Sequence, residues 1–585
     1  MKLKQIILFI FAGSILSLLF TSCKKDFLEK TPLDKLVPSN FFTSEKDLDL
    51  YVTSFYQRQM PGGLDVVQAD EMGDYTSKSL SPSYIAGAYS SINEGSWNWT
   101  NLRNINYFLE RYNNPSIPLA VRNHYAGIAR FFRAYFYFDK IKTYGDVPWY
   151  NKALATNDST LYKPRDPRAI VMDSVLADLN FASENIYDTK DATSSLVTRQ
   201  VALAFKSRIC LFEGTFRKYH TQLNLSSTAD KWLNEAADAA KKVIDAKKYK
   251  IYSTGTPTKD YRNLFISENP VTDEVMWSII YNNSLRRWHD ITWKFNSATF
   301  GSRWGLNKQF INTYLMTDGN RFTDIPGYDT MVFVNEMKNR DNRLAQTIRA
   351  LGYKRSDGSA APSNFGYTFT GYHLLKFSLD DKRLDGLTES NNSITLMRFA
   401  EVLLNYAEAK AELNQMTGTI WNQTIGVLRT RAGLPATEPT TPDNYLQSNY
   451  FPEIADKYLL EIRRERGIEL VYEGLRYADL LRWKKGNLLE KQWKGIYVPA
   501  KDLPMDLDGN GSPDVAFVDK TPTIKVPGVI YYTLTGSAKL TGGTKGFITW
   551  RDDEVRKFED KKYFHPISNT DIVLNPKLVQ NIGWQ

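Results

Sequence analysis

Two long amphipathic patterns, at 394–412 and 455–483, constrain the fold of this chain more than any other feature. A break at Gly433-Leu434-Pro435 separates them. In the first pattern, apolar residues recur at steps of three and four and polar residues take the opposite face, which predicts a surface helix packed on a core. The apolar positions are Leu396, Phe399, Ala400, Leu403, Ala407 and Ala411, and the polar ones are Arg398, Glu401, Asn405, Glu408 and Glu412. In the second, acids and bases lie three and four residues apart, which predicts a helix whose charges pair along its own length.

The same region carries a set of motifs in a fixed order. They are Leu396-Met397-Arg398-Phe399-Ala400-Glu401, Arg429-Thr430-Arg431-Ala432-Gly433-Leu434, Glu465-Arg466, Glu469-Leu470, Tyr472-Glu473-Gly474, Arg476 and Asp479-Leu480-Leu481-Arg482-Trp483. This set resembles the C-terminal signature of the SusD/RagB family, surface lipoproteins of Bacteroidetes-type bacteria that bind glycans or other nutrients. The resemblance implies a SusC-like TonB-dependent transporter as partner. It also implies a mainly α fold of TPR-like stacked helical hairpins, with a large irregular insertion that contains short strands.

The N-terminal residues are typical of a lipoprotein signal peptide. Lys2 and Lys4 precede an apolar run at 6–20, and small residues lead to Cys23. The run is shorter than the ~20 residues that a membrane-spanning helix needs. We therefore expect cleavage before Cys23, a lipid anchor on this residue, and attachment to the outer membrane. A surface-facing orientation is implied by the resemblance alone.

The chain divides into five predicted segments. They are a signal peptide (1–22), a lipid-anchored tether (23–43), an N-terminal helical region (44–251), an irregular ligand-facing insertion (252–393) and a C-terminal helical region with a loop-rich tail (394–585). Within the N-terminal region, the apolar spacing predicts helices at 44–60, 84–112, 118–143, 167–186, 195–219 and 229–246. Ser44 is the predicted N-cap of the first helix. A strand is predicted at 274–280.

Charge and cysteine content exclude two other classes of protein. The net charge of +9 is modest, and 65 acidic residues are scattered among the bases, so no basic stripe indicates nucleic-acid binding. Of the 2 cysteines, Cys210 alone remains if Cys23 carries lipid, which leaves no internal disulfide. Cys210 lies in a helical pattern and is predicted to be a small buried apolar side chain.

The aromatic content of 13%, with 13 Trp and 34 Tyr, favours a carbohydrate-binding surface, because planar rings stack against the C–H faces of sugars. Two clusters stand in suitable settings. The insertion carries Tyr281, Trp288, Trp293 and Trp304, and the N-terminal region carries Trp97 and Asn101. The alternative interpretation is that these side chains pack the insertion on the helical body, and neighbouring Trp99 is predicted to be core.

A short acidic loop indicates a calcium site. Asp506, Asp508, Asn510 and Asp514 occupy positions one, three, five and nine, with a glycine at six, as in an EF-hand loop. Phe517 occupies position twelve, where that loop has a bidentate glutamate. A solvated Asp-Gly turn is the alternative.

The acids of the family-like region do not indicate catalysis. Glu465, Glu469 and Glu473 are interleaved with arginines, and positive neighbours stabilise the ionised carboxylate rather than a proton donor. We predict structural ion pairs. The sequence has no G-x-S-x-G, no P-loop and no H-E-x-x-H motif. The resemblance therefore implies a non-catalytic glycan-binding lipoprotein that delivers oligosaccharides to its transporter. A surface glycoside hydrolase and a TPR-type protein-interaction scaffold are the alternatives.

Overall fold

The computed structural model describes residues 41–87, 89–297, 299, 301–536 and 538–584 of the chain. The predicted signal peptide, Cys23 and nearly all of the tether lie outside these residues. Within the described part of the chain, no helix is both long and apolar enough to cross a membrane.

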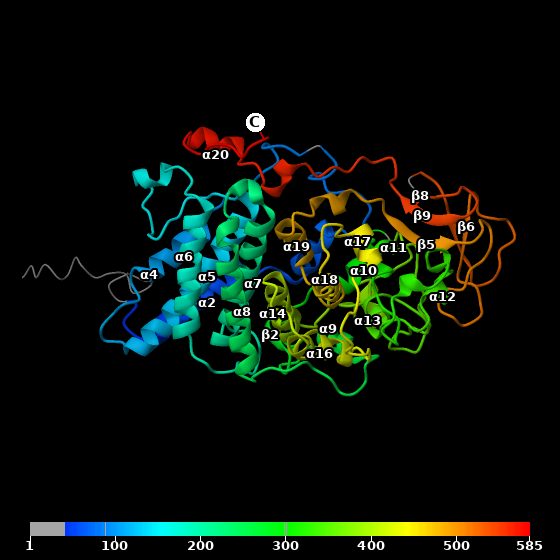
Figure 1. The fold of residues 1–585 in the computed structure, drawn as a ribbon, viewed down its shortest axis with the longest axis horizontal. Helices are drawn as coiled ribbons and strands as arrows, with labels where there is room; N and C mark the ends of the chain where they lie inside the picture. The colour runs from blue at the N-terminus through cyan, green and yellow to red at the C-terminus, as the bar shows by residue number, and fades with distance from the viewer. Residues whose placement is uncertain (1–40, 88, 298, 300, 537, 585) are drawn as a thin grey trace, which may run out of the picture.

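The N-terminal region is built from paired helices. They are α2 (Glu45–Gln59), α3 (Gly63–Gln68), α4 (Thr100–Leu109), α5 (Leu119–Tyr144), α6 (Arg168–Asn185), α7 (Arg199–Tyr219) and α8 (Ala229–Asp245). Ser44 caps α2 as predicted. Its hydroxyl accepts a hydrogen bond from the Asp47 backbone N–H at 3.3 Å, and the Asp47 carboxylate accepts one from the Ser44 backbone N–H at 2.9 Å. Consecutive helices α5 to α8 pack against one another, and α8 packs against α14. The predicted stack of TPR-like helical hairpins is confirmed (Figure 1).

The C-terminal helices continue this stack through the middle of the molecule. They are α14 (Phe399–Glu412), α15 (Gly418–Gln423), α16 (Ile425–Arg431), α17 (Asn444–Asn449), α18 (Lys457–Glu469) and α19 (Arg476–Arg482). A last short helix, α20 (Asn569–Leu574), lies near the N-terminal helices (Figure 1). One apolar core joins residues from both helical regions and contains Cys210, which is fully buried and free, as predicted.

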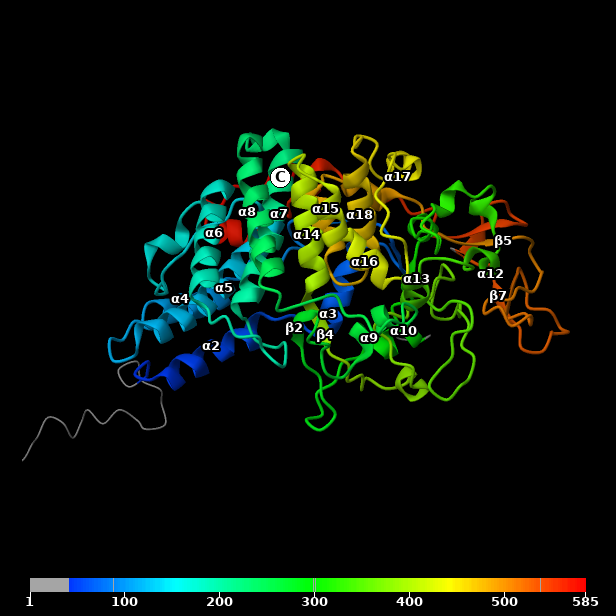
Figure 2. The same ribbon diagram turned by 60° about the horizontal axis from the view of Figure 1, so that its bottom comes forward.

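The insertion and the 494–550 segment lie together at the other end of the molecule (Figures 1 and 2). The insertion contains α9 (Asp260–Ile266), α10 (Ile291–Asn296), α11 (Lys308–Ile311), α12 (Phe333–Glu336), α13 (Asn342–Thr347), β2 (Val275–Ile279) and β3 (Gly305–Leu306). The later segment contains β5 (Lys494–Val498), β6 (Val515–Val518), β7 (Ile530–Thr533), β8 (Ala538–Leu540) and β9 (Gly546–Trp550). The predicted strand is confirmed as β2, which pairs antiparallel with β4 (Ile394–Arg398). A second apolar core unites these two segments.

The helix predicted at 84–112 is mostly wrong, because only α4 forms there. Tertiary contacts hold the preceding residues in an irregular path. The Tyr84 ring stacks on His565 at 4.3 Å, and its hydroxyl donates to the Lys562 carbonyl. The Glu94 carboxylate accepts from Tyr144 at 2.8 Å. These contacts with distant segments outweigh a helical preference that glycines already weaken.

Both amphipathic patterns are interrupted in the structure. The first begins as strand β4 and becomes helical only at Phe399. The second is broken between α18 and α19, where Tyr472 and Gly474 adopt positive φ angles of 59° and 76°. A left-handed residue cannot continue a right-handed helix, so the chain turns at this point.

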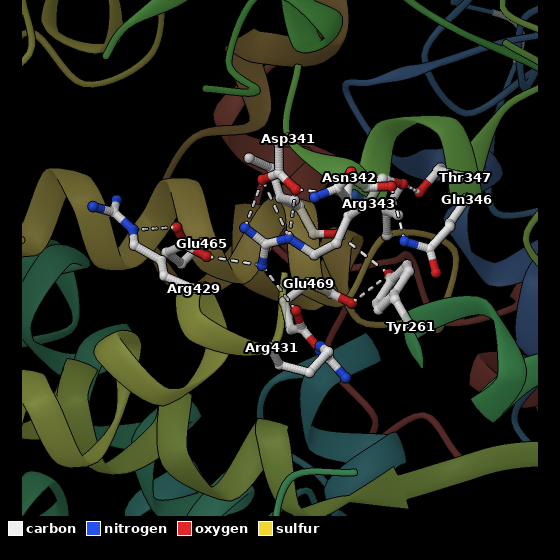
Figure 3. A network of polar contacts seen from close by, with 12 residues as sticks. Tyr261, Asp341, Asn342, Arg343, Gln346, Thr347, Arg429, Arg431, Glu465 and Glu469 are labelled. Carbon is white, nitrogen blue, oxygen red and sulfur yellow. Dashed lines mark hydrogen bonds and ion pairs between the residues drawn. The ribbon is translucent and has the colours of Figure 1, made fainter. Parts of the chain in front are cut away.

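The polar face of α14 is buried rather than solvent-exposed, which corrects the prediction of a surface helix. Glu401, Asn405, Glu408 and Glu412 are at most 2% exposed. Most charges of α18 also pair with other segments instead of along the helix. Figure 3 shows Arg343, from α13, reaching Glu465 and Glu469 of α18 at 2.9 Å each. The signature residues therefore form an ion-pair network inside the protein.

Candidate functional site

The N-terminal region and the insertion meet through direct hydrogen bonds. Strand β1 (Thr76–Ser77) pairs antiparallel with β3. The Trp304 indole N–H donates to the Glu71 carboxylate at 3.0 Å, and Glu71 also forms an ion pair with Lys78 at 2.5 Å. Two segments more than 200 residues apart in the sequence thus lie against each other.

Residues from the end of β9 contact the first of these segments at Ser79. The Trp550 indole N–H and the Arg551 guanidinium both donate to the Ser79 carbonyl, at 3.3 and 2.7 Å. The Trp550 ring stacks on Phe369 with a centroid distance of 3.8 Å and an interplanar angle of 17°. We call the set Glu71, Lys78, Ser79, Arg303, Phe369, Trp550 and Arg551 the junction face.

A cation also packs on the Phe369 ring. The Arg303 guanidinium lies 3.8 Å from the centroid of Phe369, and its Nη2 donates to the Phe365 carbonyl at 2.6 Å. Phe369 is only 3% exposed, whereas Arg303 and Trp550 are half-buried. The partly exposed Trp550 indole offers a ring for stacking, and the Arg551 and Arg303 guanidinium groups offer donors for hydroxyl groups.

The backbone of the junction face is strained at two positions. Arg303 and Arg551 have φ angles of 51° and 52°, although neither is a glycine. Such a conformation costs about 1–3 kcal/mol and persists where surrounding contacts enforce it, often at functional sites. Here the hydrogen bonds to Phe365 and Ser79 enforce it.

Two of the predicted glycan-binding residues are part of the core. Trp304 is 3% exposed and Tyr281 7% exposed. The Tyr281 hydroxyl accepts from the Gly63 backbone N–H at 2.8 Å, and its ring contacts His289. Neither ring presents a face for sugar stacking, because other side chains already cover it.

The remaining predicted residues lie in separate places. Trp288 is half-buried and donates to the Asn283 side chain at 2.7 Å. Trp293 lies on α10 beside the 301–303 loop, half-buried, with the Lys294 ammonium 4.9 Å from its ring centroid. Trp97 and Asn101 lie at α4, towards the opposite end of the molecule from α10 (Figures 1 and 2). The Asn101 amide donates to the Arg58 carbonyl. The structure does not bring the six residues together.

The acidic loop gathers its carboxylates. Asp506, Asp508 and Asp514 each offer an oxygen atom within 4.8 Å of the others. Burial, together with the charges of Asp508 and Asp506, raises the pKa of Asp514. Asn510 accepts from the Ser512 backbone N–H, and Phe517 is fully buried in β6, where it offers no ligand atom. The donor set of carboxylate oxygens fits Ca²⁺.

The carboxylates of the signature region form ion pairs, as predicted. Burial by itself raises the pKa of Glu469, but Arg431, Arg398 and Arg343 hold it well below the ordinary value. Glu465 also has a lowered pKa, because Arg343 and Arg429 outweigh its burial. A carboxylate held ionised in the interior is unsuited to act as a general acid.

Sequence reasoning missed most of the junction face. Arg303, Phe369 and Trp550 come from three loops or strand ends with no common motif. The signal that did exist was the placement of candidate aromatic residues in both the N-terminal region and the insertion. It does not include the contribution of β9.

The chain matches known proteins over most of its length. The sequence profile of the SusD family matches residues 273–584, and a profile described as starch-binding associating with outer membrane matches residues 26–211. The SusD-like protein P38 of Formosa agariphila is 26% identical over 393 residues, which cover 63% of this chain and 68% of that protein. The SusD-like protein P25 of the same organism is 24% identical over 544 residues, or 84% and 91% of the two chains.

Solved structures show the same fold. A SusD-like protein from Bacteroides fragilis has a TM-score of 0.68 and 21% identity, covering 95% of this chain and all of the other. A SusD-like carbohydrate-binding protein from the same species also has a TM-score of 0.68, with 20% identity and coverage of 92% and 100%. Since the first profile spans more than half of the 585 residues, this chain belongs to the SusD family.

Proposed function

We propose that this protein is a lipoprotein that captures oligosaccharides at the cell surface and passes them to a SusC-like TonB-dependent transporter. Membership of the SusD family carries the proposal. It is supported by a structural relative described as carbohydrate-binding and by another described with a xylogluco-oligosaccharide (TM-score 0.59). Anchoring through Cys23 places the protein at the outer membrane in this proposal.

The junction face is the proposed glycan-binding surface. Trp550 provides the ring on which a sugar stacks, and Arg303, Arg551 and Lys78 provide donors for its hydroxyl groups. Their positions are fixed by hydrogen bonds before any ligand arrives, which lowers the entropy lost on binding. A binding role without catalysis agrees with the ionised, buried state of Glu465 and Glu469.

A calcium ion at Asp506, Asp508 and Asp514, with Asn510 as a further ligand, is a second part of the proposal. Three carboxylates within 4.8 Å of one another repel, and a divalent cation would remove that repulsion. The ion would stabilise the loop between β5 and β6 without taking part in a reaction.

A glycan array probed with the soluble domain that begins after Cys23 tests the proposed function. For any glycan bound, titration calorimetry of Trp550→Ala is expected to show a loss of roughly thirty-fold in affinity, or about 2 kcal/mol, as for a stacking anchor. Tyr187→Ala, which removes a 40%-exposed ring from another surface, is the control and should bind as wild type does.

Two outcomes would overturn the proposal. Sustained release of reducing ends from a polysaccharide would identify a glycoside hydrolase. Absence of any bound glycan, together with a pull-down that recovers no TonB-dependent transporter, would favour a protein-interaction scaffold. If Trp550→Ala binds the glycan unchanged, the site lies away from the junction face.

A further inference from the structure

A pocket lies between α4, the 148–162 loop and the C-terminal segment, and it shares no residue with the junction face. Its volume is about 410 Å³. Small-molecule sites typically occupy ~300–1,000 Å³, so the pocket can enclose a compact ligand. The family comparisons and the proposed glycan surface assign nothing to it.

Aromatic rings form a corner of this pocket. Trp97 and Trp99 meet edge to face at 5.2 Å and 73°, and Trp99 meets Tyr150 at 5.7 Å and 87°. Leucines supply much of the remaining wall; they are Leu102, Leu154, Leu161, Leu574 and Leu578. The interior therefore favours an apolar body, and rings at right angles favour a flat one.

The wall on the α4 side is already ordered. The buried Asn106 amide donates to the Tyr150 and Lys152 carbonyls at 2.9 and 3.1 Å. Its oxygen accepts from Arg133, which Asp178 holds through two bonds of 2.7 Å. The amide N–H groups of Asn106 thus fix the loop, and its oxygen is already bonded to Arg133. A neutral sugar would find few free partners here, and its buried hydroxyl groups would remain unpaired.

Two cationic side chains, Arg103 and Lys152, lie at the pocket, and the nearby carboxylate of Asp158 interacts with Lys152 only through its charge. Neither Arg103 nor Lys152 forms an ion pair with any residue that the structure describes, and both side chains are exposed. The Arg103 Nε donates to the Leu154 carbonyl, which leaves its terminal nitrogens available. The lining also includes one carboxylate, Asp571, so its two cations leave the lining residues with a formal net charge of +1.

We infer that this pocket binds a small amphipathic anion, with an aryl or branched alkyl body against Trp97, Trp99 and the leucines and an acidic head group at Arg103 and Lys152. The indole rings and leucines of the lining favour a ligand with an apolar part, and the two cations favour an anion over a neutral compound of the same shape. This inference does not depend on the proposed glycan-binding function.

Two fluorescent probes with the same apolar body test the inference. 1-Anilinonaphthalene-8-sulfonate carries one acidic group, and N-phenyl-1-naphthylamine lacks it. Titration of the soluble domain is expected to show saturable one-to-one binding of the anionic probe, at least five-fold tighter than the neutral probe. Binding of both probes with equal affinity would overturn the anionic part of the inference.

Exposed residues at the pocket allow matched variants that should fold normally. Leu574 is 65% exposed and lines the pocket, whereas neighbouring Val573 is 79% exposed and does not. Leu574→Asp is expected to lower the affinity for the anionic probe at least ten-fold, whereas Val573→Asp should lower it less than two-fold. Equal effects of the two variants, or binding without a defined stoichiometry, would overturn the site.

The head group is tested by charge reversal. Lys152→Glu should lower the affinity for the sulfonate probe at least ten-fold. Its affinity for the neutral probe should stay within two-fold of the wild-type value. Lys250→Glu, at a residue whose side chain is 74% exposed and belongs to another surface, is the control. No difference between these variants would show that Lys152 does not contact the ligand. Glycan affinity measured on Leu574→Asp separates this pocket from the junction face.

Discussion

Replacing Glu469 with glutamine removes the negative charge at the centre of the buried ion-pair network while keeping the shape of the side chain. Glu469 is fully buried and accepts from Arg398 at 2.6 Å, Arg343 at 2.9 Å and Arg431. In the variant, these three guanidinium groups lose their common counter-charge, and the new amide N–H₂ group cannot accept from them.

The expected loss in the free energy of unfolding is about 3–5 kcal/mol, the usual effect of removing one partner of a buried ion pair. An unfolding entropy of ~2.1 cal/mol/K per residue gives roughly 1.2 kcal/mol/K for a chain of this length, so the melting temperature should fall by about 2.5–4 °C. Urea unfolding of the soluble domain, followed by circular dichroism, measures the free energy.

The matched control is Asp173→Asn, at an interhelical pair with Lys231. Both side chains of that pair are more than half exposed, at 57% and 56%. An exposed pair contributes ~0–1 kcal/mol, so its loss should move the melting temperature by less than about 1 °C. If Glu469→Gln is no more destabilising than this control, the network does not stabilise the fold and the reasoning is refuted.

The effect should also depend on pH. The pKa of Glu469 in the folded protein is well below its ordinary value, whereas in the unfolded chain it returns to ~4.3. The stability that its charge contributes is therefore complete above the unfolded pKa and is lost as pH falls towards the folded pKa. The difference between wild type and Glu469→Gln should be constant above about pH 5.5 and shrink below about pH 4.

The other predictions concern the anchor, the core and the ion. Cys23→Ser should move the protein from the membrane fraction to the soluble fraction, and persistent acylation of this variant would refute the anchor. Trp304→Ala should cost about 3–5 kcal/mol of stability because it opens a cavity in the second core, which urea unfolding would detect. With calcium at ~100 times its dissociation constant, binding adds about 2.7 kcal/mol, so a chelator should lower the melting temperature of wild type but not of Asp506→Asn with Asp508→Asn. An equal chelator effect on the double variant would leave only a turn.

The sequence alone determined most of the long helices and the family, and the family resemblance implied their stacking. Periodic apolar residues placed α5 to α8 within a few residues of their observed ends, and the Ser44 cap fixed the start of α2. These features are local, because a cap or a helix face depends on residues at most a few positions apart. The family motifs could also be recognised without coordinates, since they are defined by the types of their residues and by their order along the chain.

Tertiary structure alone decided what covers each face. The spacing of residues in α14 showed that its glutamates share one face of the helix. It did not show that arginines from other helices cover this face. Arg208 of α7, for example, pairs with Glu401, and Arg482 of α19 pairs with Glu408. Likewise, composition pointed to Trp304 as a ligand residue, while the fold buries its ring and leaves Trp550 half-exposed beside Ser79. Exposure depends on contacts between segments hundreds of residues apart, and no local pattern encodes which of two aromatic rings such a contact will cover.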